Sequence, residues 1–220
     1  MGCKIFSMDI FVFDDHEMMR NGIKAFFSDN SLYKIAGDAG TIEKAEKIVS
    51  DYKPETDQIA IAIVDVGFTT SPQSQEKVKG FELAKYIKQN GKNIKCIMYS
   101  SYNGQAYIRN AMSAEVGASG YVSKQSESRI LIDAVNAVFA GGTFIDPFLS
   151  SVLVTTENVI DLLSKREREV LTYIQQGLSN SQIAANMNIT ERTVENHLST
   201  IYSKTNAANK NELIEMFGKL

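Results

Sequence analysis

Five short apolar runs recur along the first 140 residues, and an amphipathic stretch follows each of them. The runs lie near residues 8–13, 33–38, 59–64, 94–99 and 119–123, and the stretches near 17–28, 41–51, 81–90, 103–116 and 126–140. Short, continuous apolar runs are typical of strands buried on both faces, and strands that alternate with helices form parallel sheets. The pattern therefore predicts five βα units, an α/β fold with a doubly wound parallel sheet.

The rest of the chain follows a different pattern. Gly141 and Gly142 end the last amphipathic stretch, and Pro147 with the Ser and Thr residues after it indicates a linker. We therefore predict a first domain over 1–140, a linker over 141–158 and a second, smaller domain over 159–220.

Short helices joined by tight turns are predicted for the second domain. Residues 164–167 have the sequence of a capping box, residues 179–182 start a second helix, and Thr190 is placed to cap a third. In the third helix, apolar residues recur at i, i+4 and i+7, and they are Val194, Leu198 and Ile201. This stripe should pack inward and leave the opposite face exposed, as in a helix-turn-helix with a recognition helix.

Polar residues follow the apolar runs where four of the predicted strands end. They are Asp14 and Asp15, Asp65, Ser100 and Lys124. Doubly wound sheets bind ligands outside the carboxyl ends of their strands, so we expect these five residues to share one pocket. Three carboxylates repel one another unless cations neutralise them, and Mg²⁺ prefers oxygen ligands plus phosphate. The pattern predicts a magnesium-assisted phosphoryl site.

Each residue of this pocket has a predicted role. Asp65 is the expected nucleophile, because a carboxylate can form an acyl phosphate once a metal shields its charge, and the two carboxylates after the first strand would organise that metal. Lys124 supplies a charge for one phosphoryl oxygen, and the Ser100 hydroxyl can turn to another after transfer. Tyr121 is a candidate switch that changes rotamer as Ser100 moves.

The amino-acid composition narrows the possible classes of protein further. The chain has 23 Lys and Arg against 26 Asp and Glu, and neither predicted domain is net basic, which counts mildly against nucleic-acid binding. Cys3 and Cys96 lie far apart without metal spacing, as in a reduced, cytosolic protein. No apolar run reaches the roughly 18 residues that a membrane span requires. We expect a cytoplasmic protein without membrane attachment.

The first domain resembles the receiver domain of bacterial response regulators. The resemblance rests on Asp14-Asp15-His16, Asp65, Ser100 and the segment 120–124. It implies a flavodoxin-like sheet of five strands in the order 2-1-3-4-5 and phosphotransfer from a histidine kinase to Asp65. It also implies that Mg²⁺ is held by Asp15, Asp65 and the backbone carbonyl of Gly67, with Asp14 acting through water. The chemistry expected of such a protein is phosphoryl acceptance and self-dephosphorylation, so it is a regulator and not an enzyme.

The second domain resembles the LuxR-type DNA-binding domain. The matching segments are 163–171, 177–180, 183–184 and 193–198. With the receiver before it, the chain is similar to the NarL/FixJ class of response regulator. Membership implies a transcription factor whose phosphorylation controls binding to promoter DNA, as a homodimer on a two-fold site.

Two features depart from the family pattern. The loop after Asp65, residues 66–80, is several residues longer than usual, which either changes kinase docking, metal access or phosphoryl lifetime or is an idle insertion. Glu195 stands where members of the class often have a basic residue, and it can accept from a cytosine amino group while Asn196 bridges an adenine edge. The remaining expected DNA contacts are Lys165, Arg166, Thr190, Arg192, Thr193, Ser199, Lys204 and Lys210.

Two other functions compete with this interpretation. A magnesium-dependent phosphohydrolase of the haloacid-dehalogenase type would also use Asp65 as nucleophile, but it requires a second Asp two residues later, where this chain has Gly67. Alternatively, the first domain is a phosphorylation-independent dimerisation module that the long loop has disabled. The complete set of pocket residues favours phosphotransfer over this second alternative.

Overall fold

The computed structural model describes residues 7–54, 58–68, 79–150, 160, 162–205 and 207–218. The chain divides into two compact units, the first of residues 1–101 and 110–146 and the second of residues 102–109 and 147–220. In the described residues, no helix combines the length and the apolar character that crossing a membrane would require.

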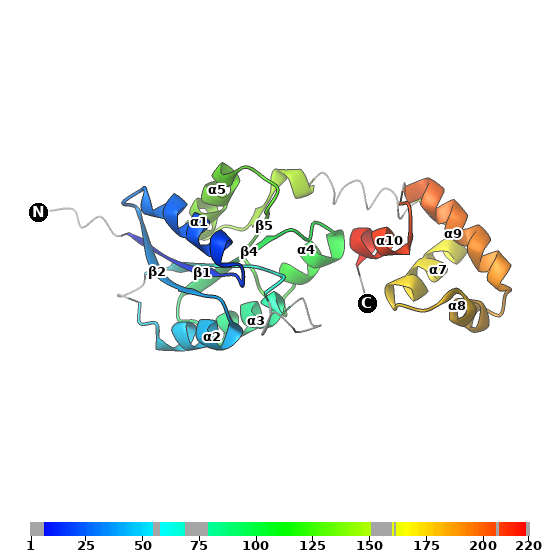
Figure 1. The fold of residues 1–220 in the computed structure, drawn as a ribbon, viewed down its shortest axis with the longest axis horizontal. Coiled ribbons are helices and arrows are strands. Elements are labelled where there is room, and N and C mark those ends of the chain that lie inside the picture. The colour runs from blue at the N-terminus through cyan, green and yellow to red at the C-terminus, as the bar shows by residue number, and fades with distance from the viewer. Residues whose placement is uncertain are drawn as a thin grey trace, which may run out of the picture. The chain divides into compact units, whose positions relative to one another are not determined.

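A parallel sheet forms the centre of the first unit (Figure 1). Its strands are β1 (Met8–Phe13), β2 (Tyr33–Ala39), β3 (Ala60–Val64), β4 (Ile94–Ser100), β5 (Gly120–Ser123) and β6 (Phe144–Ile145). The order is β2-β1-β3-β4-β5-β6, with every neighbouring pair parallel. The predicted order of the first five strands is confirmed, and the sheet has a sixth strand beside β5. This strand lies within the range assigned to the linker.

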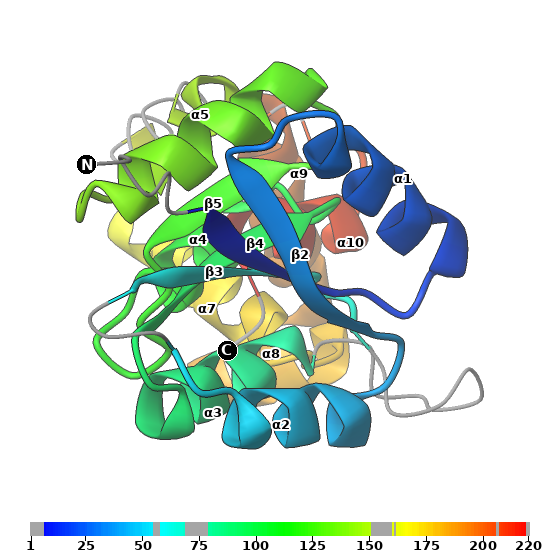
Figure 2. The ribbon, with the colours of Figure 1, turned by 90° about the vertical axis from the view of Figure 1, so that its left-hand side faces the viewer.

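The helices of this unit are α1 (Glu17–Ser28), α2 (Ile42–Asp51), α3 (Gly80–Asn90) and α5 (Ser128–Phe139). A further helix, α4 (Gln105–Ala111), follows β4 in the chain and precedes β5. Figure 2 shows α1 and α5 on one face of the sheet and α2 and α3 on the other. Strands covered on both faces must be apolar throughout, and every residue of β3 is buried.

Helix α4 is shorter than the stretch 103–116 predicted for it. The helix ends at Ala111, and turns occupy the following residues. The Ser113 hydroxyl accepts from the Val116 N–H (3.2 Å), and Gly117, at φ 72°, donates its N–H to the Ser113 carbonyl (2.8 Å). A serine side chain that bonds the backbone locally competes with the helix.

The second unit contains α7 (Lys165–Gln175), α8 (Asn180–Met187), α9 (Glu191–Thr205) and α10 (Lys210–Phe217). Capping boxes open α7 and α8, and the Thr193 N–H donates to the Thr190 hydroxyl at the start of α9 (3.2 Å). Asn188 ends α8 in the left-handed conformation, which forms the tight turn before α9. The predicted stripe of α9 lies in the core of this unit. The predicted helix-turn-helix arrangement of α8 and α9 is confirmed.

Candidate functional site

The register of the sheet brings two aspartates together. Phe13 of β1 pairs with Val64 of β3, so the next residues along each strand, Asp14 and Asp65, lie side by side. The Asp65 N–H donates to the Phe13 carbonyl (2.9 Å), which continues the ladder one step past the strands. Asp14 and Asp65 are 2% and 6% exposed, and Asp15 is half-buried.

Lys124 follows β5, which lies on the other side of β4 from β3, and its side chain reaches the two aspartates. Ser100 pairs with Ser123 of β5, and the Lys124 N–H donates to the Ser100 carbonyl (2.8 Å). Lys124 Nζ lies 2.7 Å from Asp14 Oδ2 and 3.0 Å from Asp65 Oδ2. One ammonium group thus joins the ends of β1, β3 and β5, and we call Asp14, Asp15, Asp65 and Lys124 the acidic site.

The charges in the acidic site shift one another's protonation. Burial raises the pKa of Asp65, and the nearby Asp14 carboxylate raises it further, while Lys124 and the Gly67 N–H act in the opposite direction. Burial alone would lower the pKa of Lys124, but its contacts with Asp65 and Asp14 outweigh burial, so this pKa is raised. A raised lysine pKa keeps the ammonium charged at neutral pH, where it screens the two carboxylates.

The donor set of the acidic site suits a hard divalent cation. One carboxylate oxygen from each of the three aspartates and a ring nitrogen of His16 lie within 4.8 Å of one another. Oxygen donors in this number and density are what Mg²⁺ requires. His16 Nδ1 is 2.8 Å from Asp15 Oδ1, and its backbone N–H donates to Asp14 Oδ1 (2.8 Å).

The loop after Asp65 is described only at its two ends, and residues 69–78 of the predicted long loop lie outside the described part. At the first end, the Gly67 N–H donates to Asp65 Oδ1 (3.2 Å). At the second, Gly80 packs so closely that a Cβ there would lie 2.0 Å from the Asp65 carbonyl oxygen. Gly80 is a residue that the sequence interpretation missed, since a glycine after a polar loop has the appearance of an ordinary turn.

The two predicted switch residues are fully buried. Ser100 is the last residue of β4, and Tyr121 lies in β5 opposite Met98. A third residue, Tyr99, was not predicted: its ring centroid is 6.0 Å from Lys124 Nζ, and burial raises its pKa. Tyr99 lies inside an apolar run of the sequence, and this pattern does not indicate that its ring is close to Lys124.

Arg20 is a second residue that the pattern did not indicate. Its Nη1 donates to the Asp14 carbonyl (2.6 Å), and its Nε donates to Asp38 Oδ2 (3.2 Å). Gly40 leaves room for this side chain, because a Cβ there would lie 2.8 Å from Arg20 Nη1. Arg20 therefore holds the backbone of the acidic site in place. On sequence alone it is one more polar residue of an amphipathic helix.

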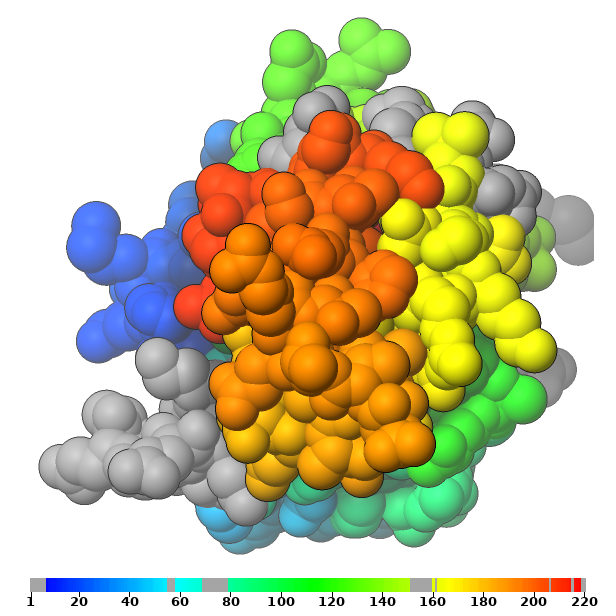
Figure 3. All heavy atoms as spheres, turned by 90° about the vertical axis from the view of Figure 1, so that its right-hand side faces the viewer, coloured from blue at the N-terminus to red at the C-terminus, as the bar shows by residue number. Residues whose placement is uncertain are grey.

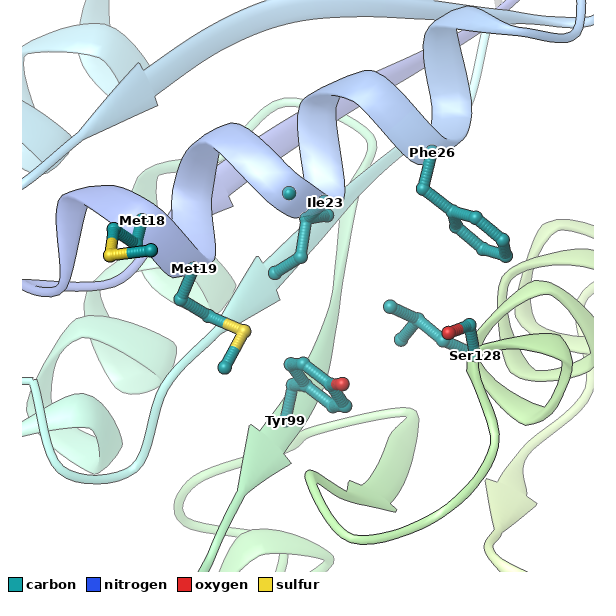
Figure 4. Close-up of a pocket in the computed structure, with 8 residues that line it drawn as sticks. Met18, Met19, Ile23, Phe26, Tyr99 and Ser128 are labelled. Carbon is teal, nitrogen blue, oxygen red and sulfur yellow. The ribbon is translucent and has the colours of Figure 1, made fainter.

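A separate hollow of about 430 Å³ lies between α1 and α5. Figure 4 shows Met19 and Ile23 of α1 above Tyr99 of β4, and Phe26 of α1 above Ser128 of α5. The lining contains no charged side chain. Most of the lining is apolar, and Tyr99 and Ser128 add hydroxyl-bearing side chains.

In the second unit, the polar side of α9 is exposed to solvent. Figure 3 shows α9 in orange at the surface of this unit. The predicted DNA contacts that are exposed are Lys165, Arg166, Thr190, Arg192, Glu195, Asn196 and Ser199, and Thr193 is half-buried. The N-terminal half of α9 and its cap thus present most of the predicted side chains along one helix.

Three of the predicted DNA contacts have partners within the protein. Lys204 Nζ lies 2.7 Å from Glu167 Oε2, and Arg166 Nη1 lies 2.9 Å from Glu169 Oε2. Lys210 Nζ lies 3.5 Å from the Leu178 carbonyl, and partial burial lowers the pKa of Lys210.

Two family models match this chain. The one described as "Response regulator receiver domain" matches residues 10–136, and the one described as "Bacterial regulatory proteins, luxR family" matches residues 161–217. Among similar proteins, the transcriptional regulatory protein DegU of Brevibacillus brevis is 25% identical over 229 residues, with 94% of this chain and 91% of DegU covered. The response regulator protein VraR of Staphylococcus aureus (strain N315) is 28% identical over 208 residues, with 91% of each chain covered.

Solved structures show the same fold. A two-component response regulator RcsB–DNA complex has a TM-score of 0.69 at 21% identity, covering 95% of this chain and 96% of that one. RcsB from Salmonella enterica serovar Typhimurium, bound to promoter P1flhDC in the presence of the phosphomimetic BeF3-, has a TM-score of 0.68 at 22% identity, with 95% and 97% covered.

The fold and the order of the two domains define a DNA-binding regulator with a receiver domain. The chain belongs to the response regulator receiver family. It carries a luxR-type DNA-binding domain after the receiver and is a two-component response regulator of the NarL/FixJ class.

Proposed function

We propose that Asp65 accepts a phosphoryl group from a sensor histidine kinase and that this phosphorylation controls sequence-specific DNA binding by the second unit. The observation that carries the proposal is Lys124 Nζ between Asp14 and Asp65, at 2.7 and 3.0 Å. This arrangement supports the proposal, because a buried carboxylate lies beside a fixed cation at the carboxyl edge of the sheet, where doubly wound folds bind ligands.

In the proposed step, a carboxylate oxygen of Asp65 attacks the phosphorus of a phosphohistidine. The new P–O bond forms as the P–N bond breaks, and the histidine nitrogen keeps the bonding electron pair and takes up a proton. Lys124 moves from Asp65 Oδ2 to a phosphoryl oxygen, since an ammonium group binds the more concentrated charge. Ser100 donates its hydroxyl to another phosphoryl oxygen. Bound Mg²⁺ supplies charge neutralisation to the incoming group.

We assign the Mg²⁺ ligands to Asp15, Asp65 and the backbone carbonyl of Gly67, with Asp14 acting through water. The proximity of the three carboxylates supports the roles of the aspartates. The Gly67 N–H donates to Asp65 Oδ1 (3.2 Å), so Gly67 lies next to the acidic site. Removal of the phosphoryl group is limited to hydrolysis of the protein's own acyl phosphate.

Phosphorylation acts on the second unit by shifting a population. A contact that exists only between Ser100 and the phosphoryl group stabilises one conformation, and Tyr121 would change rotamer as Ser100 moves. A bias of about 5.5 kcal/mol is enough to move a conformation from about 1% to about 99%. We propose that the favoured conformation binds a two-fold promoter site as a homodimer.

On the DNA side, Glu195 and Asn196 are proposed to contact base edges, and Thr190, Arg192, Thr193 and Ser199 to contact the backbone or neighbouring bases. Lys165, Arg166 and Lys210 are proposed phosphate contacts. The exposure of most of these side chains supports the assignment.

Intact-protein mass spectrometry after incubation with Mg²⁺ and acetyl phosphate tests the phosphoryl acceptor. The wild type should gain one phosphoryl group, and Asp65→Asn should gain none. Asp51→Asn changes an exposed aspartate at the end of α2 and should behave as the wild type. If Asp65→Asn also gains a phosphoryl group, Asp65 is not the acceptor. If neither protein reacts with acetyl phosphate or with a panel of phosphorylated kinases, phosphotransfer is not the function of this site.

A further inference from the structure

The ion pair between Lys204 and Glu167 joins the last turn of α9 to the first turn of α7. The side chain of Glu167 is 8% exposed and that of Lys204 is 33% exposed. Oε2 of Glu167 accepts from Lys204 Nζ and from the Ser164 N–H, both at 2.7 Å. The contact with Lys204 lowers the pKa of Glu167, so the carboxylate is ionised at neutral pH. Lys204 is therefore engaged with a buried charge that has a fixed position in the capping box of α7.

The position of Lys204 around α9 places it between the buried stripe and part of the proposed DNA-facing side. At about 100° per residue, Lys204 is about 60° from the buried Ile201 and about 80° from Asn196, but about 140° from Ser199 and about 180° from Glu195. Thr193, which is half-buried, lies about 20° from Lys204. Lys204 therefore lies on the flank of α9, next to the buried face of the helix. A side chain there, already paired at 2.7 Å with a buried carboxylate, must break that pair before it can reach the phosphate that the sequence analysis assigned to it.

We propose that Lys204 is a positioning residue and that its pairing with Glu167 fixes the rotation of α9 about its own axis. The apolar stripe of α9 prevents the helix from leaving the core, but apolar contacts are not directional and tolerate small rotations. A hydrogen-bonded ion pair on the flank is directional. The rotation sets where Glu195 and Asn196 point, so the pair controls base recognition without touching DNA. This inference rests on the DNA-binding function and is independent of phosphotransfer.

Glu167→Gln distinguishes the two roles of Lys204 by the sign of its effect. Glutamine at this position of a capping box retains the capping contact but removes the charge that holds Lys204. If Lys204 were a phosphate contact, releasing it and removing a negative charge would strengthen DNA binding. If Lys204 positions α9, the same change weakens binding to the preferred sequence.

The experiment uses the full chain and a duplex that the wild type selects from random-sequence DNA. We expect Glu167→Gln and Lys204→Met each to lose roughly tenfold in affinity for the selected duplex, comparable to one base contact, with little change for a scrambled duplex. Lys204→Arg, which retains a donor for Glu167, should restore most of the affinity.

Salt dependence provides the matched comparison. Each lost phosphate contact should reduce the slope of log affinity against log salt by about 0.9. Arg192→Met, on the exposed side of α9, should show this reduction, and Lys204→Met should retain the wild-type slope. A reduced slope in Lys204→Met, or tighter binding by Glu167→Gln, would overturn the proposal.

Hydrogen exchange of the unbound protein separates this proposal from the DNA-binding function. Faster exchange of α9 amides in both Glu167→Gln and Lys204→Met supports the positioning role, and unchanged exchange in both contradicts it. If the wild type selects no duplex, the DNA-binding function fails, while the exchange measurement still decides whether the pair holds α9.

Discussion

Replacing Lys124 with methionine tests whether one ammonium group stabilises the acidic site. Lys124 Nζ lies 2.7 Å from Asp14 and 3.0 Å from Asp65, and the three side chains are 10%, 3% and 7% exposed. With an effective dielectric constant of about 20, the two attractions are about 6 and about 5.5 kcal/mol before desolvation. Removing one partner of a buried pair costs about 3–5 kcal/mol, because the charge left behind has no compensation. We expect Lys124→Met to lose this much stability at pH 7.5 without Mg²⁺.

The pH dependence of this loss follows from the shifted pKa of Asp65. Its folded-state pKa is raised above the ordinary value of 3.8, so from 3.8 up to that raised pKa the folded state binds more protons than the unfolded state. Stability therefore falls as pH rises through this window and stays low above it. Without Lys124 the pKa of Asp65 rises further, so the variant's deficit should shrink on acidification. Lys124 itself contributes stability that is lost only as pH rises through its raised pKa, above 10.5.

Hydrogen exchange of the β1 and β3 amides, measured by mass spectrometry, reports the opening free energy of the first unit alone. Lys92→Met changes an exposed lysine before β4 and controls for the loss of one charge. Added Mg²⁺ should stabilise Lys124→Met more than the wild type, because the variant retains all three carboxylates but lacks the ammonium group that neutralises two of them. The reasoning fails if Lys124→Met stays within about 1 kcal/mol of Lys92→Met at pH 7.5, or if its deficit grows as the pH is lowered.

One further substitution tests each of the two sites, and a third serves as a control for the first. Gly80→Ala places a Cβ 2.0 Å from the Asp65 carbonyl oxygen, so the backbone must move; we expect a loss of about 1–3 kcal/mol in urea unfolding and slower phosphorylation by acetyl phosphate. Gly22→Ala, in α1 with nothing within 4 Å of its Cβ, should instead gain up to about 1 kcal/mol, and equal losses in both would contradict the steric explanation. Glu195→Lys should steepen the salt dependence of DNA binding by about 0.9 and change the base preferred at one position; an unchanged slope and sequence preference would show that Glu195 lies outside the interface.

The convergence of the acidic site was predictable because it depends on topology. Each of its residues follows a strand, and parallel strands end at the same edge of a sheet. The predicted order of the strands in the sheet has β1 beside β3 and therefore places Asp14 beside Asp65. The pairing of Phe13 with Val64 confirms this placement. The sixth strand was not predictable in this way. Phe144 and Ile145 are two residues only, and a run that short has no period that would separate it from a linker.

The sequence pattern could not predict hydrogen bonds between residues that are far apart in the sequence. The Ser164 capping box and the buried stripe of α9 are local, so spacing alone predicted both. Glu167 is part of that box, but its second partner, Lys204, is 37 residues away, and no local spacing links the two. Lys204, in the last turn of α9, was therefore predicted to contact phosphate from its charge alone. The same holds for Arg20, whose contact with the Asp14 carbonyl depends on how α1 packs against the end of β1. Charge and period predict which face a residue occupies, whereas its hydrogen-bond partner depends on the packing of elements that are separate in sequence.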